Sequence, residues 1–562
     1  MRKISISLLV GVVCLAFVAS MSAQSDHVLR NPQVSKGTFA YLPSLRDAVK
    51  NQPTELQFGF HQAPPVQRPK AALLANLGKN NTSFKDAATQ SQNLPDTIPV
   101  DELDWLGVGV GFFGYSVPDA PTDANLSIGD TQIVQWVNTS FAIFDLNGNN
   151  ILLNGQHFTS GQALFAGLPH CGSSNSGDII AQWDKIAHRW VMMQPRFSAP
   201  YYDCFAISQT PDATGAWFTY EFPTLNNSTD FPDYPKVGIW PNGYFVHHND
   251  FPNLQAFAGS MPCAYDRVKM LAGDPSAGGV CFLDNSNGTL FDDSMLPADV
   301  DDATMPPSGI DEMYVGSIDN GANGIDSNVY YYIFHFDTTN YANSTFSCVD
   351  GACKIPVTQY QIQPNAVPEP GSGNVIDTLG DRLMYRLAYR ILPAPTPAKD
   401  LLHNNRMQEW LVSHAVVGSN GATAVRWYEF RSPITAITPT AFQQGTYNPD
   451  TTNRFMSSLS RDRMGNISMS YTVSSSTVPP NIAFTGRAPG DPLGTMGTET
   501  VLHLGTGSQT DTSNRWGDYY NMGISTDGCT FVTTGEYYTA TASFAWSTRV
   551  AKLKFADCTP MN

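Results

Sequence analysis

The stretch GDYYNMGISTDGCTF, residues 517–531, predicts the fold of this chain because similar stretches recur along it. It opens with a Gly-Asp pair, continues as an apolar run and turns at Asp527-Gly528 into a second apolar run. Gly-Asp pairs open comparable runs at 129–130, 177–178 and 380–381. Short apolar runs between Gly, Asp and Asn turns are typical of β-strands and hairpins. The stretch therefore predicts one unit of a repeated β-structure.

Seven such units can be placed over residues 104–562, and each opens at a polar corner residue. The corners are Asp130, Asp178, Asp233, Asp311, Asp381, Asn453 and Asp518. Similar sheets repeated about an axis form a β-propeller, which leaves only short strand edges exposed. We predict an all-β fold, a seven-bladed β-propeller whose aspartate corners surround one mouth of a central channel. The alternative folds are a six- or eight-bladed propeller and tandem β-sandwiches.

The N-terminal region reads differently from the rest of the chain. Residues 1–23 combine Arg2 and Lys3 with a short apolar run and then small residues, which predicts a secretory signal peptide. Residues 24–103 are rich in Pro, Asn and Gln and predict a leader or linker that wraps the main domain. No later apolar run is long enough to span a bilayer. We therefore expect a secreted protein, either extracellular or periplasmic, without membrane insertion.

The formal net charge is −17, although charged residues make up only 14% of the chain. Nucleic acids and anionic membranes are bound through basic surfaces. The acidic balance therefore argues against both as partners.

Eight cysteines follow the predicted signal peptide, and an even number in an exported protein favours disulfides. We predict local pairing because each bond would then close one local loop. The predicted pairs are 171–204, 263–281, 348–353 and 529–558. The sequence contains no Cys-x-x-Cys motif, so a zinc site is not expected.

The hairpin Ser525-x-Asp527-Gly528-x-Thr530-Phe531 resembles the Asp-box of sialidase-like β-propellers, S-x-D-x-G-x-T-W. It lacks one residue of that motif and carries Phe in place of Trp. Residues 460–467, SRDRMGNI, are a looser match. Asp-boxes are structural turns, so the resemblance implies the propeller fold rather than an activity.

The stretch DRLMYRLAYR, residues 381–390, places three arginines on one face of a predicted strand. These are Arg382, Arg386 and Arg390. One interpretation is that they pair with the corner aspartates and join neighbouring blades. The other is that they bind a carboxylate or sulfate of a ligand, because the guanidinium fork matches such groups.

We predict that an extracellular glycan, or another small acidic ligand, binds at the channel mouth. The candidate ligand-binding residues are Arg382, Arg386, Arg454, Arg515, Asp130, Asp178, Asp233 and Asp311. Converging carboxylates from separate blades also make Ca²⁺ the expected cofactor, if there is one. A structural or adhesive cell-surface protein is a further alternative, because propellers serve many functions.

An enzyme at the same mouth is the other alternative, either a sialidase-like glycoside hydrolase or a polysaccharide lyase. The sialidase resemblance implies a tyrosine nucleophile, for which Tyr519 and Tyr385 are the candidates. Asp381 and Asp518 are the candidate acids. No glutamate is placed to assist the tyrosine, and the family pattern is incomplete.

Overall fold

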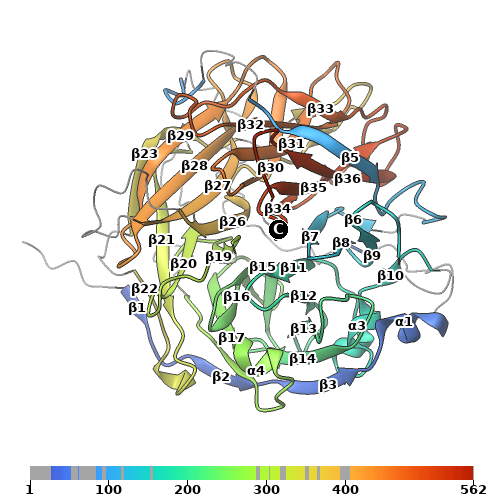
Figure 1. Cartoon of the computed structure of the whole chain (residues 1–562), viewed down its shortest axis with the longest axis vertical. Coiled ribbons are helices and arrows are strands. Elements are labelled where there is room, and N and C mark those ends of the chain that lie inside the picture. The colour runs from blue at the N-terminus through green and yellow to red at the C-terminus, as the bar shows by residue number, and fades with distance from the viewer. Residues whose placement is uncertain are drawn as a thin grey trace, which may run out of the picture.

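The computed structural model describes most of the chain. The described residues are 27–51, 61–62, 84–90, 97–115, 119–151, 156–285, 291–302, 304–316, 324–348, 353–363, 367–392 and 406–560. The predicted signal peptide, residues 1–23, lies outside them. Figure 1 shows sheets that radiate from a common centre and follow one another around it in chain order.

Antiparallel sheets dominate the described residues, so the all-β prediction is confirmed. The first sheet contains β7 (Asn125–Ile128), β8 (Gln132–Val137), β9 (Ser140–Asp145) and β10 (Thr159–Ser160). The second contains β11 (Ile180–Asp184), β12 (Arg189–Arg196), β13 (Tyr202–Ser208), β14 (Trp217–Pro223) and β3 (Thr38–Leu42). The third contains β15 (Asp230–Ile239), β16 (Gly243–Pro252), β17 (Gly259–Asp266), β18 (Gly278–Cys281) and β2 (Gln33–Lys36).

A larger sheet follows, in which two antiparallel groups share one parallel pairing. Its first group contains β19 (Leu296–Val300), β20 (Glu312–Gly316), β21 (Ile325–His335), β22 (Thr345–Cys348), β1 (His27–Leu29) and β23 (Lys354–Gln361). Its second contains β26 (Met384–Ile391), β27 (Met407–Val417), β28 (Thr423–Pro433) and β29 (Thr440–Tyr447). Strands β19 and β26 join the groups through parallel pairing of Ala298 with Leu387.

Two further sheets complete the arrangement in Figure 1. One contains β30 (Asn453–Arg461), β31 (Ile467–Ser474), β32 (Asn481–Arg487) and β33 (Thr500–His503). The other contains β34 (Asn521–Ile524), β35 (Thr530–Tyr538), β36 (Trp546–Lys554) and β5 (Val100–Leu106). Two short pairings, β24 (Val367–Pro368) with β25 (Val375–Ile376) and β4 (His61–Gln62) with β6 (Asp119–Ala120), lie outside these sheets.

The helices among the described residues are short. They are α1 (Leu45–Ala48), α3 (Gln162–Phe165) and α4 (Arg267–Leu271), with 3-10 turns η1 (Val49–Asn51), η2 (Cys171–Ser173) and η3 (Tyr341–Asn343). None of the helices in the described part of the chain has the length and apolar character needed to cross a membrane.

Several of the strands at or next to the centre are buried along their whole length. Every residue of β7, β8 and β11 is buried. Large aromatic side chains fill the space between the first two sheets, in a cluster that contains Trp136, Trp183, Trp190 and Trp217. Face-to-face packing of sheets therefore supplies the core, as expected for strands with apolar residues on both faces.

The residues predicted as a leader add edge strands to the sheets. Strand β3 pairs with β14, β2 with β18, and β1 with β22, so one segment runs along the outer edges of three successive sheets (Figure 1). Strand β5 pairs with β36, so a strand preceding the first sheet also edges the last. The expected boundary between residues 103 and 104 falls inside β5.

All four predicted disulfides are present. They are Cys171–Cys204, Cys263–Cys281, Cys348–Cys353 and Cys529–Cys558. Each closes a local loop, and Cys529–Cys558 ties the start of β35 to the segment after the last strand.

Candidate functional site

The central strands run in the same direction, which gives the centre two distinct ends. Ala181 N donates to Asn125 Oδ1, and two residues further along both strands Trp183 N donates to Ser127 Oγ. Strands β7 and β11 therefore run in the same direction. Asp518 N donates to Asp123 Oδ1 and Asn521 Nδ2 donates to Leu126 O, so the segment leading into β34 advances beside the one leading into β7. Residues that precede these strands therefore share one end, and residues that follow them share the other.

At the end where the strands begin, three carboxyl groups from three sheets converge. Oxygens of Asp123, Asp178 and Asp518 lie within 4.8 Å of one another, and all three residues are buried. Asp233 lies close enough to raise the pKa of Asp178 further. We call these four aspartates the acidic mouth.

The carboxyl groups of the acidic mouth are incompletely neutralised. Asp123 Oδ1 accepts from Asp518 N at 2.9 Å, but the buried Asp123 Oδ2 has no hydrogen-bond partner among the residues that the structure describes. Burial and the neighbouring Asp518 carboxyl raise the pKa of Asp123 to about 7. Burial, with Asp123 and Asp233 beside it, raises the pKa of Asp178 well above its ordinary value. The arrangement therefore favours binding either a proton or a cation.

Two basic side chains lie beside the acidic mouth. Lys236 Nζ donates to Pro235 O at 2.9 Å and lies 3.4 Å from the centre of the Tyr234 ring. Burial lowers the pKa of Lys236 to about 8, although the aspartates oppose that shift. Arg515 pairs with Asp518 at 2.5 Å, and its side chain is 19% exposed. Arg515 therefore marks where the mouth meets solvent.

The predicted catalytic residues lie at or near this end, where they hold structural contacts. Asp381 pairs with Arg382 at 2.9 Å, and the Arg382 guanidinium lies 4.6 Å from the centre of the Tyr234 ring. Tyr519 Oη donates to Ile179 O at 2.6 Å. Tyr385 Oη accepts from Gln182 Nε2 at 2.6 Å. These three candidates are buried, and so is the fourth, Asp518.

Asp130 and Asp311 do not lie at the acidic mouth, so their predicted positions are corrected. Asp130 follows β7 rather than preceding it, and it pairs with His188 and accepts from Thr526 Oγ1. Asp311 precedes β20, the second strand of its group, and pairs with His335. In both units the sequence pattern indicated the wrong strand as the central one. The central strands are β7 and β19, and each comes directly before the strand that was predicted.

Arg454 is also separate from the other predicted ligand-binding residues. Its guanidinium is 1% exposed and pairs with Asp450 and Glu499. Neither of these partners is one of the predicted corner aspartates.

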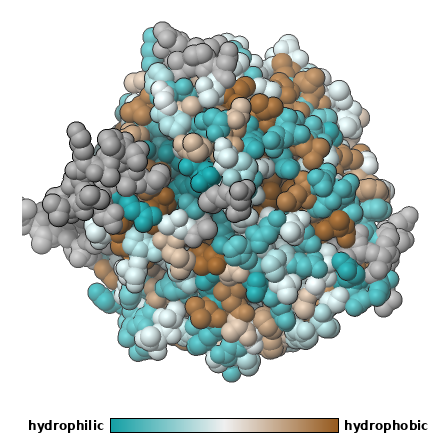
Figure 2. All heavy atoms as spheres, in the orientation of Figure 1, coloured by the Kyte–Doolittle hydropathy of each residue, from teal (hydrophilic) through white to brown (hydrophobic). Residues whose placement is uncertain are grey.

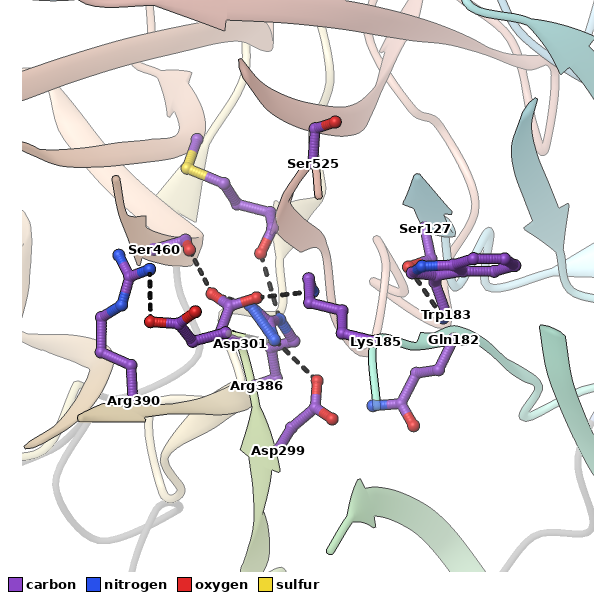
Figure 3. Close-up of polar contacts among 12 residues, drawn as sticks. Ser127, Gln182, Trp183, Lys185, Asp299, Asp301, Arg386, Arg390, Ser460 and Ser525 are labelled. Atoms are coloured by element: carbon purple, nitrogen blue, oxygen red, sulfur yellow. Dashed lines mark hydrogen bonds and ion pairs between the residues drawn. The ribbon is translucent and has the colours of Figure 1, made fainter. Parts of the chain in front are cut away.

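The three arginines of residues 381–390 lie at successive positions between the two ends of the central strands. They do not lie together at either end. Arg382 lies at the acidic mouth, whereas Arg386 pairs with Asp299 at 2.6 Å and with Asp301. Arg390 lies four residues further along β26 and pairs with Asp302 at 3.2 Å. Figure 3 shows Arg386, Lys185 and Ser460 grouped around Asp301.

The carboxyl group of Asp301 is fully engaged, in contrast to the acidic mouth (Figure 3). It accepts from Lys185 Nζ at 2.9 Å and from Ser460 Oγ, and it pairs with Arg386. Burial opposes its ionisation, yet Arg386 and Lys185 hold the pKa of Asp301 down at about 2. Two members of this network, Asp301 and Lys185, line a cavity at the end where the central strands finish.

That cavity has a volume of about 480 Å³. We call it the basic cavity, because five basic side chains line it. They are Lys185, Arg390, Arg431, Arg461 and Arg463, and the acidic side chains that line it are Asp301, Asp302 and Asp462. Pockets of this size bury small molecules in many proteins.

Four residues at the two ends of the central strands were not predicted from the sequence: Asp123, Lys185, Lys236 and Asp301. Asp123 precedes NLSI, a run too short and too polar to compete with the apolar run that follows it. Asp299 and Asp301 alternate on the strand LPADVDD, a pattern that two facing carboxylates would produce. Nothing local distinguishes Lys185 or Lys236, because the carboxyl groups that act on them lie in other sheets.

A second group of potential metal ligands contains Asp203, His248 and Cys263. Cys263 forms the disulfide with Cys281, so it has no thiolate to offer. His248 Nε2 lies 3.0 Å from Asp203 Oδ1, and Tyr265 Oη donates to Asp203 Oδ2, so both carboxylate oxygens of Asp203 already have partners.

No protein family model matches this chain. No curated protein sequence matches it either.

Several solved structures are similar at low identity. An α-L-arabinanase of Penicillium chrysogenum, solved with arabinobiose, is 10% identical over 83% of this chain and 100% of its own, with a TM-score of 0.33. A subtype N10 neuraminidase-like protein of A/little yellow-shouldered bat/Guatemala is 10% identical over 65% of this chain and 94% of its own, with a TM-score of 0.30. An exo-β-1,3-galactanase of Clostridium thermocellum is 9% identical over 83% of this chain and 98% of its own, with a TM-score of 0.29. The description of the fold rests on the strand pairing within this chain.

Proposed function

We propose that this protein is a secreted, seven-bladed β-propeller that holds a calcium ion at the acidic mouth and binds an extracellular glycan through it. The blade count follows if β19 and β26 begin two separate blades of the ten-stranded sheet. Pairing of β5 with β36 would then close the last blade onto the segment before the first. The four disulfides fit an oxidising compartment.

The observation that carries this proposal is the convergence of Asp123, Asp178 and Asp518 within 4.8 Å. Calcium prefers several oxygen ligands and accepts carboxylates in flexible geometry. Asp123 Oδ2 is buried and unpartnered, so a cation would supply the interaction that it lacks. Carboxylates from separate sheets would leave some coordination positions for water or for sugar hydroxyl groups.

A glycan is the ligand class that this chemistry favours. Hydroxyl oxygens can complete the coordination of calcium, and Arg515 stands at the solvent edge to meet a carboxylate on the sugar. Lys236 Nζ is buried against the rings of Tyr234 and Tyr519, so it lies behind the mouth rather than on its surface.

The test combines thermal unfolding with a panel of extracellular polysaccharides, each measured in chelator and in excess calcium. Calcium should raise the melting temperature, since a ligand at 100 times its dissociation constant stabilises by about 2.7 kcal/mol. Asp178→Asn should abolish that response. Asp250→Asn is the matched control, because Asp250 is another buried, unpartnered carboxyl that lies outside the cluster.

Equal melting temperatures in chelator and in calcium would contradict the metal site. Glycan binding of equal strength in both conditions would contradict calcium as the contact to the sugar. Release of shortened sugars would instead favour a glycoside hydrolase or lyase. That alternative draws on the raised pKa of Asp123, which suits a general acid.

A further inference from the structure

The basic cavity lies at the opposite end of the central strands from the acidic mouth. Asp184, Val300, Ile391, Arg461 and Ile524 are the last residues of the strands that lead to it. Residues of two hairpins form part of its wall. One is the Asp-box-like hairpin at 525–531 and the other is its looser match at 460–467.

Internal hydrogen bonds fix the shape of both hairpins. Asp527 accepts from Cys529 N at 2.8 Å and from Thr530 N at 2.9 Å. Asp462 accepts from Met464 N at 2.8 Å and from Asn466 N at 2.9 Å. Arg463 N donates to Gly528 O at 2.7 Å, which joins the two hairpins. The wall is therefore preorganised, so little entropy is lost when a ligand binds there.

Guanidinium groups gather on one side of the cavity. Arg461 pairs with Glu409 and Glu429, and Arg431 shares Glu429 with it. Arg390 Nη1 donates to Arg461 O at 2.6 Å. Arg463 is exposed at the rim, where its Nη1 donates to Thr559 O. The residues that line the cavity include five basic and three acidic side chains, so the lining itself carries a net positive charge.

The pKa of one neighbouring side chain reflects this positive charge. Burial and the nearby guanidinium groups of Arg461 and Arg431 lower the pKa of Arg487. An anion in the cavity would balance that positive charge.

The remaining wall suits an organic ligand that carries hydroxyl groups. Leu392, Met407 and Pro489 give it an apolar side, and Thr526 and Ser525 give it hydroxyl groups. We propose that the basic cavity is a second ligand site, separate from the acidic mouth, and that it binds a small acidic sugar through Arg431 and Arg463. Its volume of about 480 Å³ limits the ligand to a short saccharide or one end of a chain.

The test is calorimetric titration of the disulfide-bonded full chain with D-galacturonate, D-galactose and sulfate, all in chelator. Galacturonate should bind at least about tenfold more tightly than galactose, as expected for one charge-assisted pair. It should also bind more tightly than sulfate, which cannot use the apolar and hydroxyl walls.

Arg431→Gln and Arg463→Gln should each weaken galacturonate binding by about tenfold. Arg549→Gln is the matched control, because the Arg431 and Arg549 side chains are both 22% exposed and each pairs with one carboxylate residue. It should leave binding unchanged. Arg463 is exposed, so its variant stays informative even if Arg431→Gln unfolds.

Equal affinity for galacturonate and galactose would overturn the proposal, as would equal affinity for galacturonate and sulfate. Unchanged binding in both arginine variants would also overturn it. Failure here leaves the calcium response of the acidic mouth intact, so the two proposals can be separated experimentally.

Discussion

At one end of the central strands, Asp123, Asp178 and Asp518 converge around a carboxylate oxygen that lacks a partner. At the other end, Asp301 is held by Arg386, Lys185 and Ser460. Both ends are built on the same parallel strands and both bury aspartates. They differ in how many cations the neighbouring sheets supply, and that difference decides what each end can bind.

The consequence for the pKa values is opposite at the two ends. Burial raises the pKa of Asp123 to about 7, whereas Arg386 and Lys185, against the effect of burial, hold the pKa of Asp301 at about 2. A buried carboxylate is stable only when paired charges and hydrogen bonds offset its lost hydration. The acidic mouth is therefore suited to recruit a cation, and the basic cavity is suited to recruit an anion.

The comparison predicts the largest stability loss for Arg386→Met. Arg386 is 2% exposed and lies between Asp299 and Asp301, so its removal leaves two carboxylates with less compensation. The free energy of unfolding should fall by about 3–5 kcal/mol. Urea denaturation measures it, and a loss as small as that of an exposed arginine would contradict the central role of the pair.

Asp250 is a buried carboxyl on the side of the acidic mouth, and neither of its oxygens has a hydrogen-bond partner among the described residues. It tests whether such a group lowers the free energy of unfolding. Burial and the nearby Asp230 raise its pKa from 3.8 to about 7. As pH rises from about 4 to 7, the unfolded chain loses this proton first, so the wild type loses stability over that range.

Asp250→Asn should remove that loss and become up to about 4 kcal/mol more stable than the wild type above pH 7. The two proteins should differ little from each other at pH 4. Parallel pH profiles for both proteins in urea denaturation would show that the wild-type carboxyl is ionised without penalty.

Asp301 should show the reverse dependence on pH. Its folded-state pKa is lowered from 3.8 to about 2, so its stabilisation is complete above pH 4 and disappears as pH falls toward 2. The difference between wild type and Asp301→Asn should therefore shrink by about 2.5 kcal/mol over that range. A difference that stays constant down to pH 2 would mean that Asp301 acts through packing alone.

The smallest effect is expected for Arg515→Gln. Its side chain is 19% exposed and pairs with Asp518 at 2.5 Å, so the loss in chelator should be about 1 kcal/mol. Excess calcium should offset that loss, because the cation takes over the neutralisation of Asp518. Thermal unfolding with and without calcium measures both values, and a loss that calcium leaves unchanged would argue against a cation at this mouth.

Much of the architecture was predictable because its signals are local. Alternating apolar residues and Gly-Asp turns predicted the strands, and sequence proximity predicted the four disulfide pairs. The turn aspartates Asp462 and Asp527 were predictable for the same reason, since each bonds to residues within its own hairpin.

The two misplaced corners show where local signals failed. The true central strands β7 and β19 are four and five residues long, and each contains polar residues. The stronger apolar pattern of β8 and β20 drew the prediction to the wrong strand and hence to Asp130 and Asp311. Burial of polar residues in a central strand depends on neighbouring sheets, which a local pattern does not contain.

The sequence by itself determined the strand content, the turns and the disulfides, because these depend on residues close together in the chain. It also predicted that Arg386 would lie on a strand within the structure. Only the tertiary structure decided that Arg386 meets Asp299 and Asp301, and that Asp123 meets Asp178 and Asp518. These groups come from different sheets, and the free energy of a buried charge depends on every group that surrounds it in space.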